Sequence, residues 1–322
     1  LNRIGELPPS DGTSPTGGVF QYGTANVIAF AQSGDRNTIE YVEQYGRANS
    51  VAFSVDGDRN VSALVYQNNE SWGAYASGNA ISVTVLGSDN GGGGSGWVGE
   101  LIETPTLSVP GVAQGVLSQI GDANSIDLTI IEGLDSRYGI SQVGTGNQAL
   151  VSFASDVPGA NSARNESALF QVGDDNYLAH TVTGHDSSAA IRIEGNRNNL
   201  RLSQAGGFNL TQAVLIGNDN NAPGLLLSGD AGTLAASLGG GLGAGDIRQT
   251  GSGSSASAQN AITIALAGSG NGFALFQDGQ ANAITGSIEG GFNTLVVAQQ
   301  HMGNQADIAQ SGSSNTMTMH QF

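Results

Sequence analysis

Four acidic residues could carry acid–base chemistry in this sequence. Asp135, Asp156, Glu166 and Asp186 lie near interruptions of a repeating pattern, where a β-helical fold could bring them together. Two suitably spaced carboxyl groups act as acid and base in enzymes that cleave polysaccharides. The regular repetition leaves no evident site around them, and no Gly-x-Ser-x-Gly motif is present. We therefore expect solvated loop acids and no enzymatic activity.

Metal binding is suggested by two short segments. Gly87-Ser88-Asp89-Asn90 and Gly217-Asn218-Asp219-Asn220 have the Gly and Asp content of calcium-binding turns, but the tandem nonapeptides of a β-roll are missing. Cysteine is absent, and the histidines lack the close spacing of zinc ligands. The histidines are His180, His185, His301 and His320. We expect no metal and no cofactor, and leave open whether calcium binds the acidic turns.

A repeated motif dominates the chain. Gln-x-Gly-x-x-Asn occurs nine times, and six further sites keep Gly-x-x-Asn with an apolar residue in place of Gln. The full motifs are Gln21, Gly23, Asn26; Gln32, Gly34, Asn37; Gln44, Gly46, Asn49; Gln119, Gly121, Asn124; Gln142, Gly144, Asn147; Gln171, Gly173, Asn176; Gln204, Gly206, Asn209; Gln277, Gly279, Asn282; and Gln310, Gly312, Asn315. The apolar variants begin at Val55, Val85, Ile193, Leu215, Leu266 and Ile288. This repetition is typical of a repeat protein.

The residues after each motif Asn have a period of two. The second and fourth are usually apolar and the sixth is Gln or apolar, as in Asn26, Ile28, Phe30 and Gln32. Alternate residues of a strand share one face, so these side chains point toward a common core. One strand–turn–strand unit cannot bury that face alone, but stacked units can. We predict an all-β fold, a β-solenoid of about ten coils with a length of roughly 50 Å, at about 4.8 Å per coil.

The inward amide side chains need hydrogen-bond partners. An unpaired buried amide costs about 1 to 3 kcal/mol. Identical amides in successive coils can donate to one another and form ladders along the long axis. We predict ladders for Gln. For Asn two interpretations stay open, because Asn also tolerates the positive φ angles of turns.

Composition limits the expected partners. The 322 residues include 50 glycines and are 39% hydrophobic and 11% charged, which is too apolar for disorder. All ten basic residues are Arg, and the net charge of −17 argues against nucleic acid as a partner, because phosphate binding requires a basic surface. No uninterrupted apolar run approaches the roughly 18 residues that span a bilayer, so we expect no membrane insertion.

Three stretches interrupt the repeat, near 88–113, 154–164 and 229–257. We interpret them as loops that bulge from turns, where a stacked core tolerates insertions. Residues 1–18 contain prolines and no motif, which predicts a flexible N-terminal leader before one repeat domain, residues 19–322. Because the chain begins at Leu1 without a basic and apolar leader, we expect a mature form whose signal peptide has been removed.

Four acidic residues directly follow motif glycines: Asp35, Asp58, Asp122 and Asp174. Stacked coils would bring such like charges near one another, which could restrain assembly as gatekeeper charges do. Asp after Gly is also a good turn former. Both interpretations are compatible.

The repeat resembles the curlin repeat of the bacterial curli subunit. The resemblance covers nearly the whole chain after residue 18, although alternate strands often lack the Gln. The final segment, Ser314-Asn315-Thr316-Met317-Thr318-Met319-His320-Gln321-Phe322, is similar to the curlin C-terminus. The segment Phe20-Gln21-Tyr22-Gly23-Thr24-Ala25-Asn26 resembles the entry to the first curlin repeat.

The resemblance implies a secreted structural subunit that self-assembles outside the cell into a cross-β amyloid fibre of biofilm matrix with a role in adhesion. The fibre-forming positions would be the Gln, Gly and Asn of each full motif. Implied partners are further copies of the chain, a nucleator subunit and outer-membrane export machinery. The alternatives are a monomeric β-solenoid adhesin, with residues 88–113 and 229–257 as contact surfaces, and a β-helical polysaccharide-active enzyme.

Overall fold

The computed structural model describes residues 3–4, 18–71, 76–91, 101–104, 107–154, 164–238, 240–251 and 255–322. These residues form an all-β stack built on two large parallel sheets, which confirms the predicted solenoid fold class. Most of the leader predicted for residues 1–18, and all of the insertion at 154–164 except its two end residues, lie outside the described residues.

The two sheets, here called sheet A and sheet B, have twelve and eleven strands. Sheet A contains β1 (Arg3–Ile4), β2 (Gly18–Thr24), β4 (Thr38–Arg47), β6 (Val61–Asn68), β10 (Val116–Asp122), β12 (Arg137–Thr145), β14 (Glu166–Val172), β16 (Ser188–Glu194), β18 (Asn209–Ile216), β20 (Asn260–Ala267), β22 (Ala283–Glu289) and β24 (Gln305–Ser311). Sheet B contains β3 (Val27–Ser33), β5 (Ser50–Asp56), β7 (Ala80–Ser88), β11 (Ser125–Leu134), β13 (Gln148–Ala154), β15 (Tyr177–His185), β17 (Asn199–Gly207), β19 (Asp246–Thr250), β21 (Gly272–Gln280), β23 (Thr294–Met302) and β25 (Thr316–Gln321).

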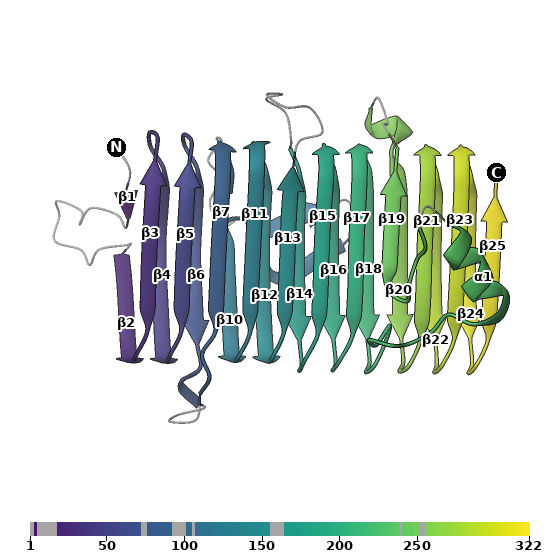
Figure 1. The fold of residues 1–322 in the computed structure, drawn as a ribbon, viewed down its shortest axis with the longest axis horizontal. Helices are drawn as coiled ribbons and strands as arrows, with labels where there is room; N and C mark the ends of the chain where they lie inside the picture. The colour runs from purple at the N-terminus through teal and green to yellow at the C-terminus, as the bar shows by residue number, and fades with distance from the viewer. Residues whose placement is uncertain are drawn as a thin grey trace.

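The chain alternates between the sheets, so that one strand of sheet A and the next strand of sheet B make one coil. Sheet B has eleven strands, and the described residues therefore form eleven coils, from β2–β3 to β24–β25. Figure 1 shows the strands side by side along the long axis, with the first coil at the N-terminal end and the last coil at the C-terminal end. The estimate of about ten coils was one short.

The hydrophobic core lies between the two sheets. In β5, Val51, Phe53 and Val55 are buried and the residues between them are exposed. One continuous cluster of such residues extends through the coils, because each inward residue aligns with the inward residues of the neighbouring coils. The cluster reaches partly buried Phe30 in the first coil and Met319 in the last. Among the residues that the structure describes, the core is thus partly exposed at both ends of the rod.

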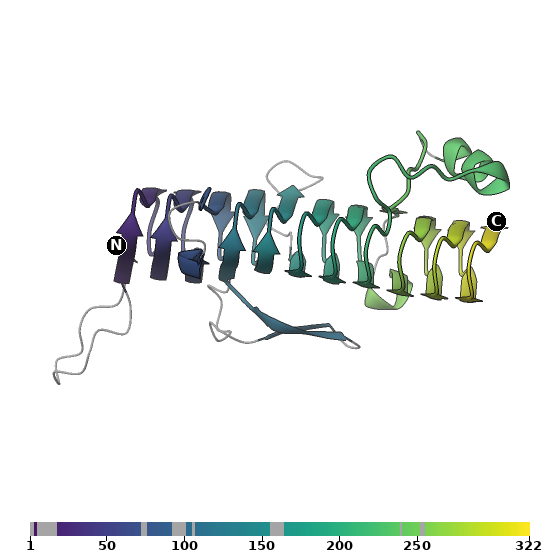
Figure 2. The same ribbon diagram turned by 90° about the horizontal axis from the view of Figure 1, so that it is seen from below.

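Two elements lie on the outer faces of the rod, on opposite sides (Figure 2). β8 (Leu101–Thr104) and β9 (Leu107–Ala113) form an antiparallel hairpin, and β9 lies over β12, β14 and β16 of sheet A. Helix α1 (Gly229–Ser237) packs Ala231 and Ala235 against β21 and β23 of sheet B. A short 3-10 helix, η2 (Ala256–Ala258), precedes β20.

The stretch predicted as a loop at 229–257 is not one loop. It contains α1 and also β19, a core strand that pairs with β17 and β21. Ile247 and Gln249 of β19 are buried, as the alternation of a core strand requires. The prediction missed this strand because no Asn follows three residues after Gly251. The interpretation of 88–113 as a loop is corrected in the same way, since it contains the hairpin.

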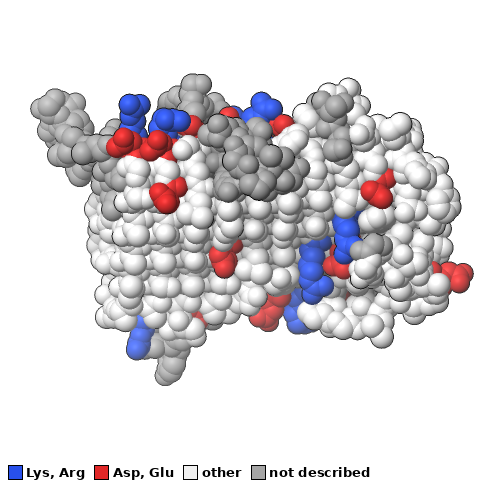
Figure 3. All heavy atoms as spheres, turned by 45° about the horizontal axis from the view of Figure 1, so that its top comes forward, with Lys and Arg blue, Asp and Glu red and all other residues white. Residues whose placement is uncertain are grey.

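Charged side chains are sparse on the outer surface. Figure 3 shows a face with wide uncharged areas, on which several Arg side chains lie beside acidic ones and other acidic side chains stand apart. Arg59 pairs with Asp89 at 2.5 Å, and Arg197 pairs with Asp219 at 2.7 Å. Among the described residues, none of the helices has the length and apolar character needed to cross a bilayer.

Candidate assembly surface and its side-chain ladders

A ladder of Gln side chains runs through the first six coils in sheet A. Each Nε2 donates to the Oε1 of the Gln in the next coil, over 2.7 to 2.9 Å. The ladder consists of Gln21, Gln44, Gln67, Gln119, Gln142 and Gln171. All of them except Gln21 are buried.

Each ladder amide after Gln21 also donates a hydrogen bond to a backbone carbonyl oxygen. Gln44 Nε2 donates to the carbonyl oxygen of Val27 at 3.1 Å, and Gln119 Nε2 donates to that of Ala80 at 3.1 Å. Both N–H groups of such an amide are thereby used, and its oxygen accepts from the preceding coil. Because every polar atom has a partner, the amides can be buried without the penalty of an unpaired group.

The Gln ladder changes sheets in the middle of the molecule. Beyond Gln171 the aligned residues of sheet A are Ile193, Leu215, Leu266 and Ile288. In sheet B the same core row holds apolar residues from Val55 to Val182 and then a second ladder with spacings of 2.8 to 2.9 Å. That ladder consists of Gln204, Gln249, Gln277, Gln299 and Gln321.

His180 occupies the point where the second ladder begins. Its Nε2 lies 2.9 Å from Oε1 of Gln204, and its Nδ1 lies 3.0 Å from Oγ of Ser167. Because Gln204 Oε1 can only accept, the imidazole donates from Nε2 and accepts at Nδ1. Burial lowers the pKa of His180 to about 4, opposed by the hydrogen bond to Gln204, so the ring is neutral at pH 7. A neutral histidine therefore supplies the donor that the first Gln of the ladder would otherwise lack.

Two Gln residues of the full motifs stand outside both ladders. Gln32 in the first coil aligns with Val55, and Gln310 in the last coil aligns with Ile288. Among the described residues, Gln32 Nε2 and Gln310 Oε1 have no hydrogen-bond partner although both atoms are buried. The end coils thus carry Gln in both sheets, whereas each inner coil has Gln in one sheet and an apolar residue in the other.

A column of Asn side chains follows the turns from sheet A to sheet B. Each Asn backbone N–H donates to the Oδ1 of the Asn in the preceding coil, for example Asn147 to Asn124 at 3.1 Å. The column consists of Asn26, Asn49, Asn79, Asn124, Asn147, Asn176, Asn198, Asn220, Asn271, Asn293 and Asn315. It is unbroken over all eleven coils. The ladder interpretation of Asn is therefore confirmed. The alternative, that Asn serves a turn through a positive φ, is wrong, because the positive φ belongs to the residue before each Asn, as at Ala25, Ala48 and Arg197.

The opposite turns carry a second, interrupted column. Its Asn residues include three from the full motifs: Asn37, Asn209 and Asn282. Ser136 and Ser187 replace Asn in two coils. A Ser side chain cannot offer the two amide N–H groups of Asn, so the amide-to-amide pattern stops at these coils.

The motif glycines are required where coils come closest. Gly23, Gly34, Gly46, Gly121, Gly144, Gly173, Gly206, Gly279 and Gly312 all have positive φ. A Cβ added to Gly144 would lie 2.0 Å from the carbonyl oxygen of Gly173 in the next coil, which no side chain could tolerate. Gly312 lies in the last coil, and there an added Cβ would meet only Asn315 Nδ2, at 3.3 Å.

The acidic residues after the motif glycines accept hydrogen bonds from neighbouring coils. Asp58 accepts from the backbone N–H of Asp35 at 2.6 Å, and Asp174 accepts from that of Thr145 at 2.9 Å. Asp122 accepts from the N–H of Gly78 at 2.9 Å. Asp35 and Asp58 thus lie in adjacent coils, as the gatekeeper interpretation requires, and the other two serve as acceptors in turns.

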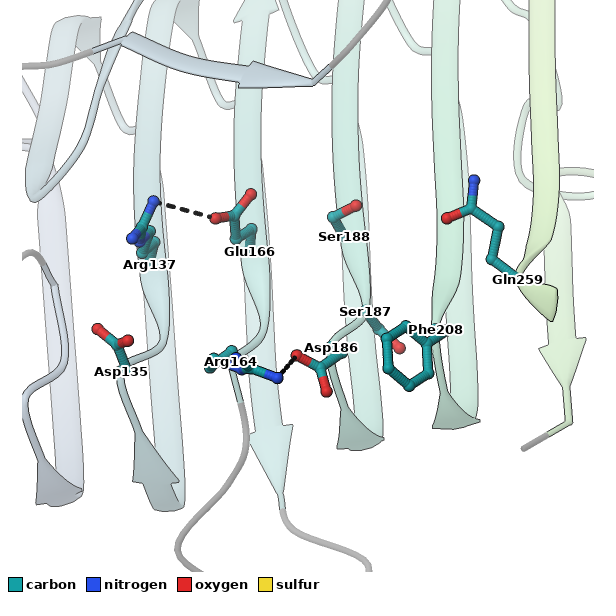
Figure 4. Close-up of a pocket in the computed structure, with 9 residues that line it drawn as sticks. All are labelled: Asp135, Arg137, Arg164, Glu166, Asp186, Ser187, Ser188, Phe208 and Gln259. Carbon is teal, nitrogen blue, oxygen red and sulfur yellow. Dashed lines mark ion pairs between the residues drawn. The ribbon is translucent and has the colours of Figure 1, made fainter. Parts of the chain in front are cut away.

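Three of the four candidate catalytic acids lie together. Figure 4 shows Asp135, Glu166 and Asp186 lining a surface groove of about 340 Å³. Arg137 lies 3.4 Å from Glu166, and Arg164 lies 2.7 Å from Asp186. Burial raises the pKa of Glu166, while Arg137 opposes the shift. The fourth acid, Asp156, lies outside the described residues.

The groove is a network of ion pairs between neighbouring coils. A glycoside-cleaving pair needs one carboxyl group to give a proton and a second to act as base or nucleophile. Here two of the three carboxylates are held by Arg. The candidate calcium segments are similar, since Asp89 and Asp219 are each bound by an Arg through two hydrogen bonds. Within the described ranges, no group of three or more His, Asp or Glu residues is placed to hold a metal ion.

Four ladder residues lie outside the full motifs, and sequence reasoning missed two of them, Gln249 and Gln299. The other two, Gln67 and Gln321, follow an Asn by seven and six residues and were expected on the inward face. Gln299 has His301 where the motif has Gly, and His301 adopts a positive φ of 72° there. The period of two provides a signal for Gln299 and Gln321, because each lies six residues after an Asn of the main column.

A scan of the chain against models of known protein families finds no match, and a search among curated proteins finds no similar sequence.

Proposed function

We propose that this chain is a structural subunit of an extracellular, curli-like amyloid fibre, which grows by end-to-end stacking of solenoids. The subunit would be secreted and would serve a biofilm matrix and adhesion without chemistry of its own. A nucleator subunit and outer-membrane export machinery are proposed partners. The curlin-type motif supports this proposal, and the geometry of the two rod ends carries it.

The observation that matters most is that, among the described residues, no strand pairs with the outer side of β2–β3 or of β24–β25. Val19 of β2 is 43% exposed, although its aligned neighbour Val42 in the next coil is fully buried. Met319 of β25 is only partly buried and packs against the core cluster. Most soluble β proteins cover or charge such edges, because unpaired strands pair with other chains. Within the described part of the chain, β25 has a paired strand on one side only.

A stacked subunit would continue the interactions that join the inner coils. The step from β22 to β24 aligns seven residue pairs, and that from β23 to β25 aligns six. Each step adds backbone hydrogen bonds, a layer of core and a rung of amides. Parallel in-register strands with amide ladders are the features that stabilise cross-β fibres. Growth along the long axis therefore requires no change of fold.

Electron microscopy and fibre diffraction test the proposal. The purified chain, free of denaturant and incubated at micromolar concentration, is expected to form fibrils with a reflection near 4.8 Å along the fibre axis. Persistent monodisperse rods would refute the fibre proposal. They would favour a monomeric adhesin, or an enzyme with the groove at Asp135, Glu166 and Asp186 as its site.

A further inference from the structure

We propose that the junction between subunits is in register, with Gln310 stacked on Gln21 and Gln321 stacked on Gln32 of a second copy of this chain. This inference rests on the proposed end-to-end assembly and specifies its interface. The last coil of one copy, β24–β25, then occupies the place of a coil directly before β2–β3 of the next. Both Gln ladders cross the junction.

The first support is the position of the two Gln residues outside the ladders. The inner neighbour of Gln32 is Val55, and that of Gln310 is Ile288, and neither side chain can hydrogen-bond. The side chain of Gln310 is nevertheless buried, with 5% exposure. An amide partner for either residue can come only from the outer side of its coil. Within the described part of the chain, no further strand lies on that outer side.

The second support is that each residue continues a ladder of the neighbouring copy. Sheet A of one copy begins with six Gln rungs at Gln21, and Gln310 of the preceding copy adds a seventh. Sheet B of one copy ends with five rungs at Gln321, and Gln32 of the following copy adds a sixth. In the fibre no Gln of these core rows stands alone. The atoms without partners, Gln32 Nε2 and Gln310 Oε1, mark the outermost rungs of these extended ladders.

The third support is polarity. Within both ladders Nε2 of one coil donates to Oε1 of the next coil toward the C-terminus. At the junction Gln310 Nε2 and Gln321 Nε2 therefore point to Oε1 of Gln21 and Gln32. Among the described residues Gln321 Nε2 reaches one acceptor, the carbonyl oxygen of Gln305, whereas Gln299 Nε2 reaches two. A head-to-head contact would make the strands antiparallel and break this direction.

The fourth support is the match of apolar residues around the amides. Successive strand pairings place Ile308 of the last coil in the row that begins at Val19. The corresponding row in sheet B begins at Phe30 and ends at Met319. In-register docking thus sets apolar residues on apolar residues and amides on amides. A shift by one residue would turn these side chains to the wrong face.

Cysteine cross-linking tests this register, because the chain has no Cys of its own. Tyr22 and Ser311 are outward residues of one row, at opposite ends of sheet A. In the proposed junction their Cα atoms are about 4.8 Å apart, within the range of a disulfide. The double variant Tyr22→Cys with Ser311→Cys should form covalent chains of subunits when its fibres are oxidised. These appear as a ladder of bands on non-reducing gels.

The matched control shifts one Cys by two residues on the same face. Tyr22→Cys with Ala309→Cys places the Cα atoms about 8 Å apart, beyond disulfide reach, and is expected to link at least tenfold less. Fibres whose shifted pair links as readily, or whose in-register pair does not link, overturn the proposed register and leave the fibre proposal intact. Failure of the unmodified chain to form fibres overturns the fibre proposal itself, and the register with it.

Discussion

The two halves of the rod bury one Gln per inner coil in the same way, but in opposite sheets. From Gln44 to Gln171 the amide rung lies in sheet A and an apolar residue occupies the matching row of sheet B. From Gln204 to Gln299 the rung lies in sheet B and the apolar residue in sheet A. The coil therefore accepts one buried Gln in either sheet. What it requires is that successive coils place the Gln in the same row.

The reason lies in the needs of an amide. A buried Gln beside an aliphatic residue in its row needs another hydrogen-bond partner, because an aliphatic side chain offers neither donor nor acceptor. One change of sheet therefore creates two ladder ends inside the rod. Gln171 closes the first with backbone acceptors at Gln148 and Asn176, and His180 opens the second. A random mixture of Gln and aliphatic rungs would leave unpaired amides in many coils.

The largest effect is expected when a Gln is placed in the sheet that carries apolar residues in that half of the rod. Leu215→Gln would put an amide between Ile193 and Leu266 in a row that is apolar at this point. We expect the free energy of unfolding to fall by about 4 kcal/mol, from lost apolar burial and an unpaired amide. Urea unfolding measures it. Leu215→Met, with similar volume and no hydrogen-bonding need, should cost less than about 1.5 kcal/mol.

Acidification should weaken the point where the ladder changes sheets. The pKa of His180 is about 4 in the folded chain and near 6.5 when unfolded. As the pH falls, the unfolded chain therefore takes up a proton on this histidine before the folded chain does. The contribution of neutral His180 to the free energy of unfolding is complete above about pH 6.5 and is lost as the pH falls to about 4. The loss is on the order of 3 kcal/mol. Urea unfolding of the unmodified chain and of His180→Gln across this pH range isolates the contribution of His180. If the free energy of unfolding changed equally with pH in both proteins, the prediction would be wrong.

Removing a rung from the first half should have a smaller effect. Gln142→Leu keeps the approximate size but leaves Gln119 Nε2 without its acceptor and Gln171 Oε1 without its donor. We expect a loss of about 2 kcal/mol in the free energy of unfolding. Thermal unfolding of Gln142→Leu beside Gln142→Met should give equal losses. A melting temperature at or above that of the unmodified chain would show that the ladder adds no stability.

The smallest effect on the single subunit is expected at its ends. Gln32→Val and Gln310→Ile extend the apolar rows of Val55 and Ile288 and remove two buried atoms without partners. The free energy of unfolding of the monomer should rise by up to about 1 kcal/mol. The critical concentration for assembly should rise about tenfold, because the junction loses two amide rungs. Unchanged assembly would mean that these Gln residues do not serve the junction.

Much of this architecture follows from local patterns in the sequence. The positive φ of the motif glycines, the alternation after Asn26 and the stacking of amides were all predictable, because turns and strand faces depend on neighbouring residues. The sheet in which each Gln lies could not be predicted from local patterns. That assignment depends on the number of half-coils before it, and the stretch from 217 to 245 concealed the strand that carries Gln249. The clustering of Asp135, Glu166 and Asp186 likewise depends on coil alignment rather than on local sequence.

The hairpin β8–β9 and helix α1 have a consequence for any filament built from this rod. They lie on opposite outer faces, over sheet A near its middle and over sheet B near its C-terminal end. Among the described residues, neither contacts the first coil, whereas α1 also contacts β25 in the last coil. Growth in length uses the ends of the rod, whereas thickening requires flat sides that can lie against one another. Because these two elements protrude from both outer faces, they hinder the side-by-side packing of filaments. Filaments of this chain are therefore expected to stay thin as they lengthen.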